Sequence, residues 1–395
     1  MGLAIGLSRS SQWFNKNEPK ANGRACLSAE MQTPDLKGER LPYMPQLDAV
    51  RAFAVLTVVI HHYSSFADLG ILSAVGAAFL GVKLFFVLSG FLITGILLRS
   101  RDDAEAMKQT RGTALGHFYA RRFLRIFPLY YFVIAVATAV NFDPVRENLL
   151  WLLTYTLNIH MVNQGYYVAN FAHFWSLAVE EQYYFAWPWI VLFAPRRLLM
   201  PLTLIMISVG PLYRFYGVMA ELKGIATYIF TPACLDALGM GSLLAILSHS
   251  DKWKHALNRL LTKLVLPIGL GATVTFNVLS HYRIGWKADT VLFDLAVALV
   301  FCWLISGASR GFQGVVGAVL KWKPLVYTGK ISYGIYVYHP LVPALCVAAS
   351  QALGFHLQEG ARTTVLVFTV ATFAIATLSW CFMEKPINNL KRYFN

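Results

Sequence analysis

The segment LDAVRAFAVLTVVIHHY, residues 47–63, is typical of a membrane-spanning helix, yet it contains an arginine and two histidines. Arg51 and His62 are eleven residues apart, close to three helical turns, so their side chains share one helical face at roughly 16 Å along the axis. His61 points about 100° away from that face, and Asp48 lies one turn before Arg51, where the two could pair. Ionisable groups inside a membrane segment are costly and by default indicate function. The pair predicts a site that holds an anionic ligand near Arg51 and performs proton chemistry near His62.

Each residue alone has a plainer interpretation. Arg51 could anchor the helix at the inner membrane surface, where lysine and arginine collect. His62 could be a core histidine that is hydrogen-bonded and has no further role. Their shared face at this spacing favours the functional interpretation.

The composition of the whole chain is that of a polytopic membrane protein. Of its 395 residues, 57% are hydrophobic and 14% are charged, whereas soluble domains carry about 25% charged residues. The net charge of +14 would suggest nucleic acid in a soluble protein, but in a membrane protein it reflects cytoplasmic loops, so we expect no nucleic-acid partner. The five cysteines are scattered, and no Cys/His spacing is typical of a disulfide framework or a metal site.

Apolar stretches of helical length predict an all-α bundle of about ten transmembrane helices. The expected spans are 48–66, 79–98, 127–143, 174–194, 198–217, 229–248, 264–280, 290–307, 331–350 and 362–382. The stretch 149–160 is short and ends in polar residues, so we expect a re-entrant or surface helix there. Lysine and arginine concentrate in alternate connections, which places both chain termini in the cytoplasm.

The expected organisation has three parts. Residues 1–45 are a polar cytoplasmic leader, residues 46–390 a transmembrane domain and residues 391–395 a short cytoplasmic tail. The leader lacks an apolar core region and a small-residue cleavage site, so it does not resemble a cleaved signal peptide, and we expect it to be poorly ordered.

Two arginines in RRFLRIFPLYY, residues 121–131, form a second candidate site. Arg122 and Arg125 are three residues apart on one helical face, and we expect them at the cytoplasmic mouth of the third span. Pro128 is expected to start or kink that helix. Two guanidiniums on one face suit a phosphate, because each donates a planar fork of hydrogen bonds. Anchoring at the inner membrane surface is the alternative.

A third candidate site lies in HFWSLAVEEQYYFAWPW, residues 173–189. Glu180 and Glu181 lie within about two turns of the outer end of the expected fourth span, and Ser176, on the face of Glu180, could orient it. A carboxylate in an apolar helix can transfer protons or orient an imidazole. The aromatic residues favour an interfacial belt, although they could also stack on a sugar. They are Trp175, Tyr183, Tyr184, Trp187 and Trp189.

Isolated polar residues in other spans are weaker candidates. Ser89 and Gly90 in LFFVLSGFLITG favour close helix packing. Asp236 is an isolated acid in TPACLDALGMG, and His339 directly precedes Pro340 in ISYGIYVYHP. Each could be a structural polar contact or part of a site wall.

Together these segments resemble the acyltransferase-3 family of membrane-bound O-acyltransferases. The matching pieces run in family order over about residues 46–390: LDAVRAFAVLTVVIHHY, FFVLSGFLIT, FYARRFLRIFPLYY, FWSLAVEEQYYFAWP, LDALGMGSLLA, ISYGIYVYHP and MEKPINNL. The family's three polar motifs fall, in order, on Arg51 and His62, on Arg122 and Arg125, and on Trp175, Ser176, Leu177 and Glu180. Tyr183 departs from the family pattern, where phenylalanine is usual.

The resemblance implies a multi-pass enzyme of the bacterial inner membrane. Family members move an acyl group, most often acetyl, from cytoplasmic acyl-coenzyme A to a hydroxyl of a carbohydrate. The first expected acceptor is the O-antigen of lipopolysaccharide or another surface polysaccharide, and peptidoglycan, a periplasmic glucan and a lipid-linked oligosaccharide are further candidates. Acyl-coenzyme A is a co-substrate, and no permanently bound cofactor is expected. Many members carry a further extracytoplasmic domain; we expect this chain to act alone or with a separate partner.

The resemblance also suggests roles for the candidate residues. Arg51, Arg122 and Arg125 would hold the donor's phosphates. His62 would be the general base on the acceptor hydroxyl, and Glu180 would orient His62 or hold the sugar. Ser89 or a helix-end amide would stabilise the oxyanion. A covalent acyl-histidine relay is an alternative. The residues expected to line or support the site are Asp48, Ser89, Trp175, Ser176, Asp236 and His339.

Three other functions compete with this one, of which a sensor or structural membrane protein would have no need of the arginine, histidine and glutamate residues. A transporter of acyl groups or lipid-linked sugars would also use buried charges, but it predicts internal repeats or spans broken in corresponding halves, which the sequence does not show. An acyltransferase acting on a glycosylated small molecule has the same motifs and differs only in its acceptor.

Overall fold

The computed structural model describes residues 43–64, 77–282, 287–354, 356–357 and 361–394. Most of these residues are helical and none is in a strand, which confirms the predicted all-α class. The predicted leader, 1–45, lies almost entirely outside the described residues. The helices are α2 (Pro45–Ser64), α4 (Ala77–Glu105), α5 (Arg111–Ala139), α6 (Leu149–Leu153), α7 (Leu157–Gln164), α8 (Phe174–Phe193), α9 (Arg196–Met219), α10 (Gly224–Ile229), α11 (Thr231–His249), α12 (Asp251–Leu260), α13 (Leu266–Tyr282), α14 (Ala288–Arg310), α15 (Gly314–Leu320), α16 (Lys323–Lys330), α17 (Ser332–Tyr338), α18 (Val342–Ala352), α19 (Arg362–Ser379) and α20 (Lys385–Asn389).

Seven helical stretches in the described part of the chain are long and apolar enough to cross a membrane. Each overlaps one predicted span, and the protein is therefore a polytopic helical membrane protein. The three remaining predicted spans correspond to α2 and α8, of 20 residues each, and to the broken segment α17–α18. The total of ten spans and the cytoplasmic location of both termini stay predictions.

The helix α5 begins far earlier than predicted. It starts at Arg111, where the Thr110 hydroxyl accepts a hydrogen bond from a backbone amide of the first turn (3.0 Å). Pro128 lies inside this helix and does not start it. Arg122 and Arg125 therefore lie within a continuous helix, and their position at the cytoplasmic mouth of the third span stays a prediction. The hydropathy pattern misses the start because this first half of α5 is rich in charged residues.

The predicted span 331–350 is not one helix. The helix α17 ends at Tyr338 and α18 begins at Val342, with Pro340 between them. Proline has no amide hydrogen and its ring clashes with the carbonyl four residues earlier, so it breaks a helix interior. The break places His339 at the end of α17, inside the bundle.

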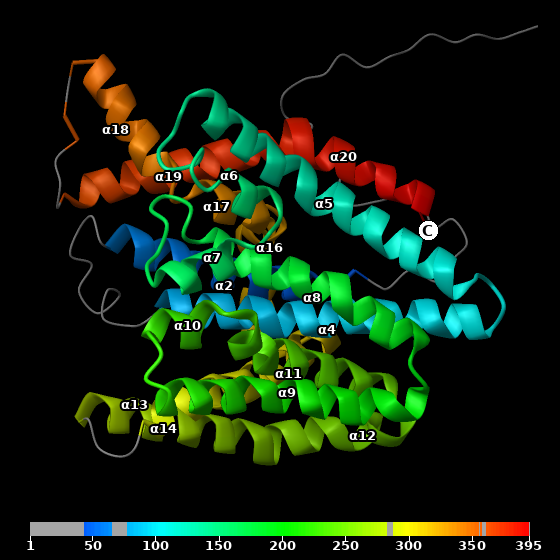
Figure 1. Cartoon of the computed structure of the whole chain (residues 1–395). Coiled ribbons are helices and arrows are strands. Elements are labelled where there is room, and N and C mark those ends of the chain that lie inside the picture. Colours follow the sequence, from blue (N-terminus) through cyan, green and yellow to red (C-terminus); the bar gives the residue numbers. More distant parts are fainter. Residues whose placement is uncertain (1–42, 65–76, 283–286, 355, 358–360, 395) are drawn as a thin grey trace, which may run out of the picture. The chain divides into compact units, whose positions relative to one another are not determined.

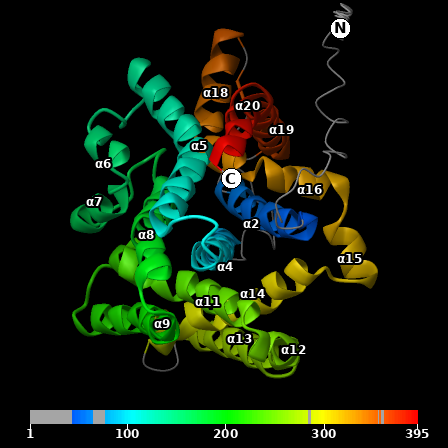
Figure 2. The same cartoon turned by 90° about the vertical axis from the view of Figure 1, so that its right-hand side faces the viewer.

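The helix α4 lies at the centre of the bundle. It contacts α2, α8, α11 and α14, which surround it together with α5 (Figure 2). The helices α4 and α11 approach closely because small residues face each other. A Cβ on Gly90 would overlap the Leu238 carbonyl, and one on Gly241 would overlap the Val87 carbonyl. The close packing predicted at Gly90 is confirmed.

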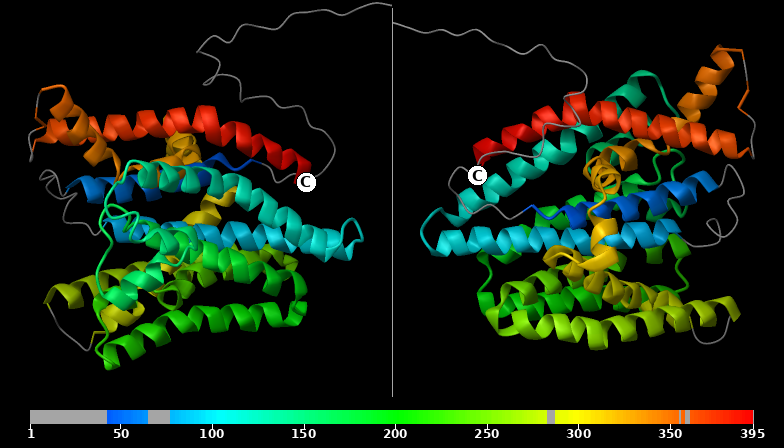
Figure 3. Two further views of the ribbon diagram at one scale, coloured as in Figure 1. Left: turned by 45° about the horizontal axis from the view of Figure 1, so that its top comes forward. Right: turned by 180° about the vertical axis from the view of Figure 1, so that it is seen from behind.

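The helices form three tiers, which Figures 1 and 3 show from different sides. The middle tier contains α2, α4 and α8. One outer tier contains α5, α19 and α20, and the other contains α9, α13 and α14. The candidate site residues come mainly from the middle tier and from α5 and α17.

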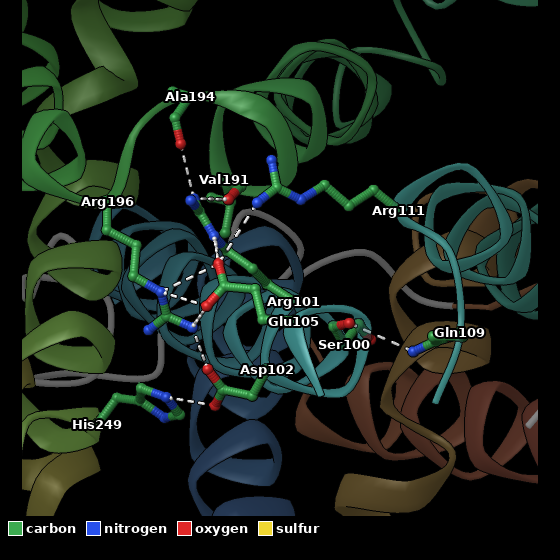
Figure 4. A network of polar contacts seen from close by, with 10 residues as sticks. All are labelled: Ser100, Arg101, Asp102, Glu105, Gln109, Arg111, Val191, Ala194, Arg196 and His249. Atoms are coloured by element: carbon green, nitrogen blue, oxygen red, sulfur yellow. Dashed lines mark hydrogen bonds and ion pairs between the residues drawn. The ribbon is translucent and has the colours of Figure 1, made fainter. Parts of the chain in front are cut away.

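An ion network joins helix ends at one side of the bundle (Figure 4). Arg101 is buried near the end of α4 and donates to the backbone carbonyls of Val191 (2.7 Å) and Ala194 (2.8 Å) at the end of α8. It also pairs with Glu105 (2.9 Å), which in turn pairs with Arg196 at the start of α9. This network holds the ends of α4 and α8 together.

Candidate functional site

A cavity of about 100 Å³ inside the bundle brings three of the predicted motifs together. We call it the arginine cavity. Five helices supply its polar lining, so residues from distant parts of the sequence meet there. The predicted site residues that line it are Arg51, Ser89, Arg122, Arg125, Ser176 and Glu180. Glu181, Tyr184, Ser332, Tyr333 and Tyr336 also line it.

Three arginines and two glutamates line the arginine cavity. Arg51 is paired with Asp48 at 3.0 Å, which confirms the predicted pair. The Arg122 guanidinium lies 5.7 Å from the centres of two aromatic rings, one of them Tyr184. Neither Arg122 nor Arg125 forms an ion pair with any residue that the structure describes. Two guanidiniums without a direct ion-pair partner can each donate a fork of hydrogen bonds to a phosphate.

Glu180 is held by residues of α4 and α8. Its Oε1 accepts a hydrogen bond from Ser89 (2.5 Å), and the Ser89 oxygen accepts one from Tyr184 (2.9 Å). Ser176 donates to a backbone carbonyl one turn earlier (3.1 Å) and also contacts the Tyr336 hydroxyl (2.5 Å). The expectation that Ser176 orients Glu180 is therefore wrong, because Ser89 from α4 makes that contact. The Ser89 proton is also engaged by Glu180 and is not directed at an oxyanion.

A chain of hydrogen bonds determines which nitrogen of His62 carries a proton. Pro340 has no amide hydrogen, so the Tyr336 carbonyl lacks its usual helical donor, and His339 Nδ1 lies 2.8 Å from that oxygen and donates to it. His339 Nε2 is then the acceptor, 3.1 Å from His62 Nδ1. The Val58 carbonyl is a second acceptor, 3.0 Å from the same His62 nitrogen. His62 therefore carries its proton on Nδ1 and has a lone pair on Nε2.

The same break in the helix determines which group donates to the His339 carbonyl. Pro343 cannot donate to the His339 carbonyl, and the Tyr63 hydroxyl donates to it instead (2.8 Å). The ring of His173 lies 5.3 Å from that of His339. Sequence reasoning missed His173, although it is the first residue of the quoted segment 173–189.

His62 and His339 lie outside the lining of the arginine cavity. Tyr336 connects the two regions, since its side chain lines the cavity and its carbonyl binds His339. The orienting contact that we expected from Glu180 thus comes from His339.

The aromatic residues of α8 do not form an interfacial belt. Trp175, Tyr183, Tyr184 and Trp187 are each at most 5% exposed, whereas Trp189 is 50% exposed. The belt interpretation is wrong for the four buried rings, because α8 packs its aromatic face against α4.

Asp236 is isolated in the sequence but paired in space. Arg214 contacts Asp236 (2.5 Å) and Asp294 (3.0 Å), and Lys83 pairs with Asp294. All four residues are at most 6% exposed, and two cations balance two anions. Asp236 does not line the arginine cavity. Sequence reasoning missed Lys83, Arg214 and Asp294, although a charged residue in each of three predicted spans is a usable signal.

This fold and site define a polytopic membrane protein with a buried polar centre. Residues 44–384 match the sequence profile of the acyltransferase-3 family, described as an acyltransferase domain. The chain belongs to this family, which confirms the resemblance found in the sequence.

Two similar proteins are O-acetyltransferases by name. The chain is 26% identical over 371 residues to O-acetyltransferase OatA of Staphylococcus aureus, covering 87% of this chain and 57% of that protein. It is 28% identical over 378 residues to peptidoglycan O-acetyltransferase OatA of Listeria monocytogenes, covering 89% of this chain and 57% of that protein. The chain thus spans somewhat more than half the length of these relatives. No solved structure matches it significantly.

Proposed function

We propose that this protein is an O-acyltransferase of the bacterial inner membrane that moves an acetyl group from acetyl-coenzyme A to a hydroxyl of a cell-envelope glycan. Family membership and the names of the two relatives support acyl transfer, and the Listeria relative makes peptidoglycan the first acceptor to test. The observation that carries the proposal is the arginine cavity. Arg51, Arg122 and Arg125 line it together and would bind the phosphates of the donor.

The proposed reaction uses His62 as general base. Its Nε2 takes the proton of the acceptor hydroxyl as that oxygen attacks the thioester carbonyl. The carbon–sulfur bond then breaks, the acetyl group stays on the sugar as an ester, and the coenzyme A thiolate takes up the proton from His62. His339 acts as a positioning residue, because it accepts the Nδ1 proton of His62. Glu180 would hold the sugar, and an acyl-histidine intermediate is the alternative route.

The test compares His62→Ala with His61→Ala, its neighbour on another face of α2. A strain lacking the gene receives the wild type or one variant at equal membrane level, and ester-linked acetyl groups on its glycans are measured by mass spectrometry. We expect the ester with the wild type and His61→Ala and its absence with His62→Ala. A wild-type ester level in His62→Ala would refute the assigned base. An ester profile that does not depend on the gene would refute transfer to a glycan.

A further inference from the structure

A second cavity, of about 710 Å³, lies where α10, α13 and the start of α14 meet the start of α4. Small-molecule sites in proteins commonly measure about 300–1,000 Å³ and combine apolar walls with a few polar groups. This cavity is large enough for a sugar unit of a glycan. The function proposed above assigns it no role.

Aromatic rings supply one wall of the second cavity. Phe79 stacks on Tyr228 with ring centres 5.7 Å apart, and it packs against Phe293 at 5.5 Å. Phe276 adds a fourth ring from α13. Aromatic faces are flat and apolar, and they match the carbon–hydrogen face of a pyranose ring.

Polar groups with open hydrogen-bonding capacity line the same cavity. The side chains of Asn277, Asp289 and Thr290 form no hydrogen bond with any residue in the described part of the chain. Asp294 uses only its Oδ2 in its ion pairs with Lys83 and Arg214, so Oδ1 can still accept a proton donor. A hydroxyl-rich ligand satisfies both amide and carboxylate groups, whereas a lipid chain would leave them unpaired.

The charge of this lining distinguishes it from the arginine cavity. Arg214 and Asp294 belong to the balanced ion network with Lys83 and Asp236, whereas Asp289 forms no ion pair with any residue that the structure describes. An anionic phosphate would therefore meet the Asp289 carboxylate here. The lining therefore favours a neutral ligand with many hydroxyl groups.

Trp175 lies between the two cavities. Its ring packs against Phe86, which lines the arginine cavity, at 5.9 Å, and against Tyr228, which lines the second cavity, at 5.2 Å. We propose that the second cavity is a subsite for a further sugar unit of the acceptor glycan, separated by this aromatic partition from the arginine cavity, where Glu180 would hold the reacting sugar. This inference rests on the proposed function for the identity of its ligand as part of an acceptor.

The test measures binding of a defined oligosaccharide by the purified full chain in detergent. The probe is the β-1,4-linked trimer of N-acetylglucosamine, titrated by calorimetry into the wild type, Asn277→Ala and Phe293→Ala. Thr275→Ala is the matched control, because Thr275 is exposed on α13 and does not line the cavity. Losing one hydrogen bond should raise the Kd of Asn277→Ala for the trimer about threefold to tenfold, and the Kd of Thr275→Ala should match that of the wild type.

Two results would overturn the subsite: no binding of the trimer by the wild type, or wild-type affinity in both cavity variants. Asn277 is exposed, so its replacement leaves the folded core intact even if Phe293→Ala does not fold. The glycan ester assay separates this inference from the proposed function. Weaker trimer binding in the cavity variants, with no gene-dependent ester, would support a sugar site but refute the transferase. A gene-dependent ester with unchanged trimer affinity in both variants would support the transferase but refute the sugar site.

Discussion

Replacing Arg214 by methionine should destabilise the protein by about 3–5 kcal/mol, because it breaks a buried ion network. Arg214 is 2% exposed and contacts Asp236 at 2.5 Å and Asp294 at 3.0 Å. It also donates to the backbone carbonyls of Ala233 (2.5 Å) and Val291 (3.1 Å). Methionine fills similar volume but supplies neither charge nor donor.

The magnitude follows from the charge balance. In the wild type, Lys83 and Arg214 neutralise Asp236 and Asp294. Without Arg214, two buried carboxylates face one lysine, and an uncompensated buried charge costs about 3–5 kcal/mol. Protonation of one carboxylate would limit the loss, so the upper figure applies only if both stay ionised.

Adding Asp236→Asn to Arg214→Met removes the excess charge and should recover a substantial part of the loss. We expect a coupling of about 1–3 kcal/mol between the two substitutions. Thermal unfolding in detergent, followed by tryptophan fluorescence, measures the stability of Arg214→Met, of Asp236→Asn and of the double variant. Arg197→Met is the control, because Arg197 is exposed, and its free energy of unfolding should stay within about 0.5 kcal/mol of the wild type. Simple addition of the two single losses would refute the charge-balance reasoning.

Three further predictions test the site and its packing. Glu180→Gln should reduce turnover of radiolabelled acetyl-coenzyme A about 10²-fold or more, which is a larger loss than Glu181→Gln should cause. A larger loss in Glu181→Gln would show that Glu181 and not Glu180 is the functional carboxylate. Arg122→Ala should weaken coenzyme A binding at least about tenfold in a calorimetric titration, because a charge-assisted phosphate contact is lost; equal affinity would remove its phosphate role. Gly241→Ala should lower the free energy of unfolding by roughly 1–3 kcal/mol, because the new methyl group overlaps the backbone of α4. Gly95→Ala is the control, since a methyl group there meets no atom within 4 Å. Equal melting temperatures of the two variants would contradict this packing.

Hydropathy predicted the membrane helices well because a span is a local property of about twenty residues. It failed where a second local effect intervened. Charged residues in the first half of α5 lowered its hydropathy, so its start was missed. A single proline divides the otherwise continuous apolar segment at α17 and α18 into two helices. Charged residues within predicted spans, Lys83 and Arg214 among them, were visible in the sequence but went unused.

The sequence by itself determined the helical class, the membrane character and the residue types of the site. Spacing identified Arg51 with His62 and Arg122 with Arg125, because residues three, four or eleven apart share a helical face. The partners across helices came only from the tertiary structure: Ser89 holds Glu180 across 91 residues, and His339 contacts His62 across 277. Helical periodicity determines neighbours along one helix, whereas packing of separate helices determines which faces meet.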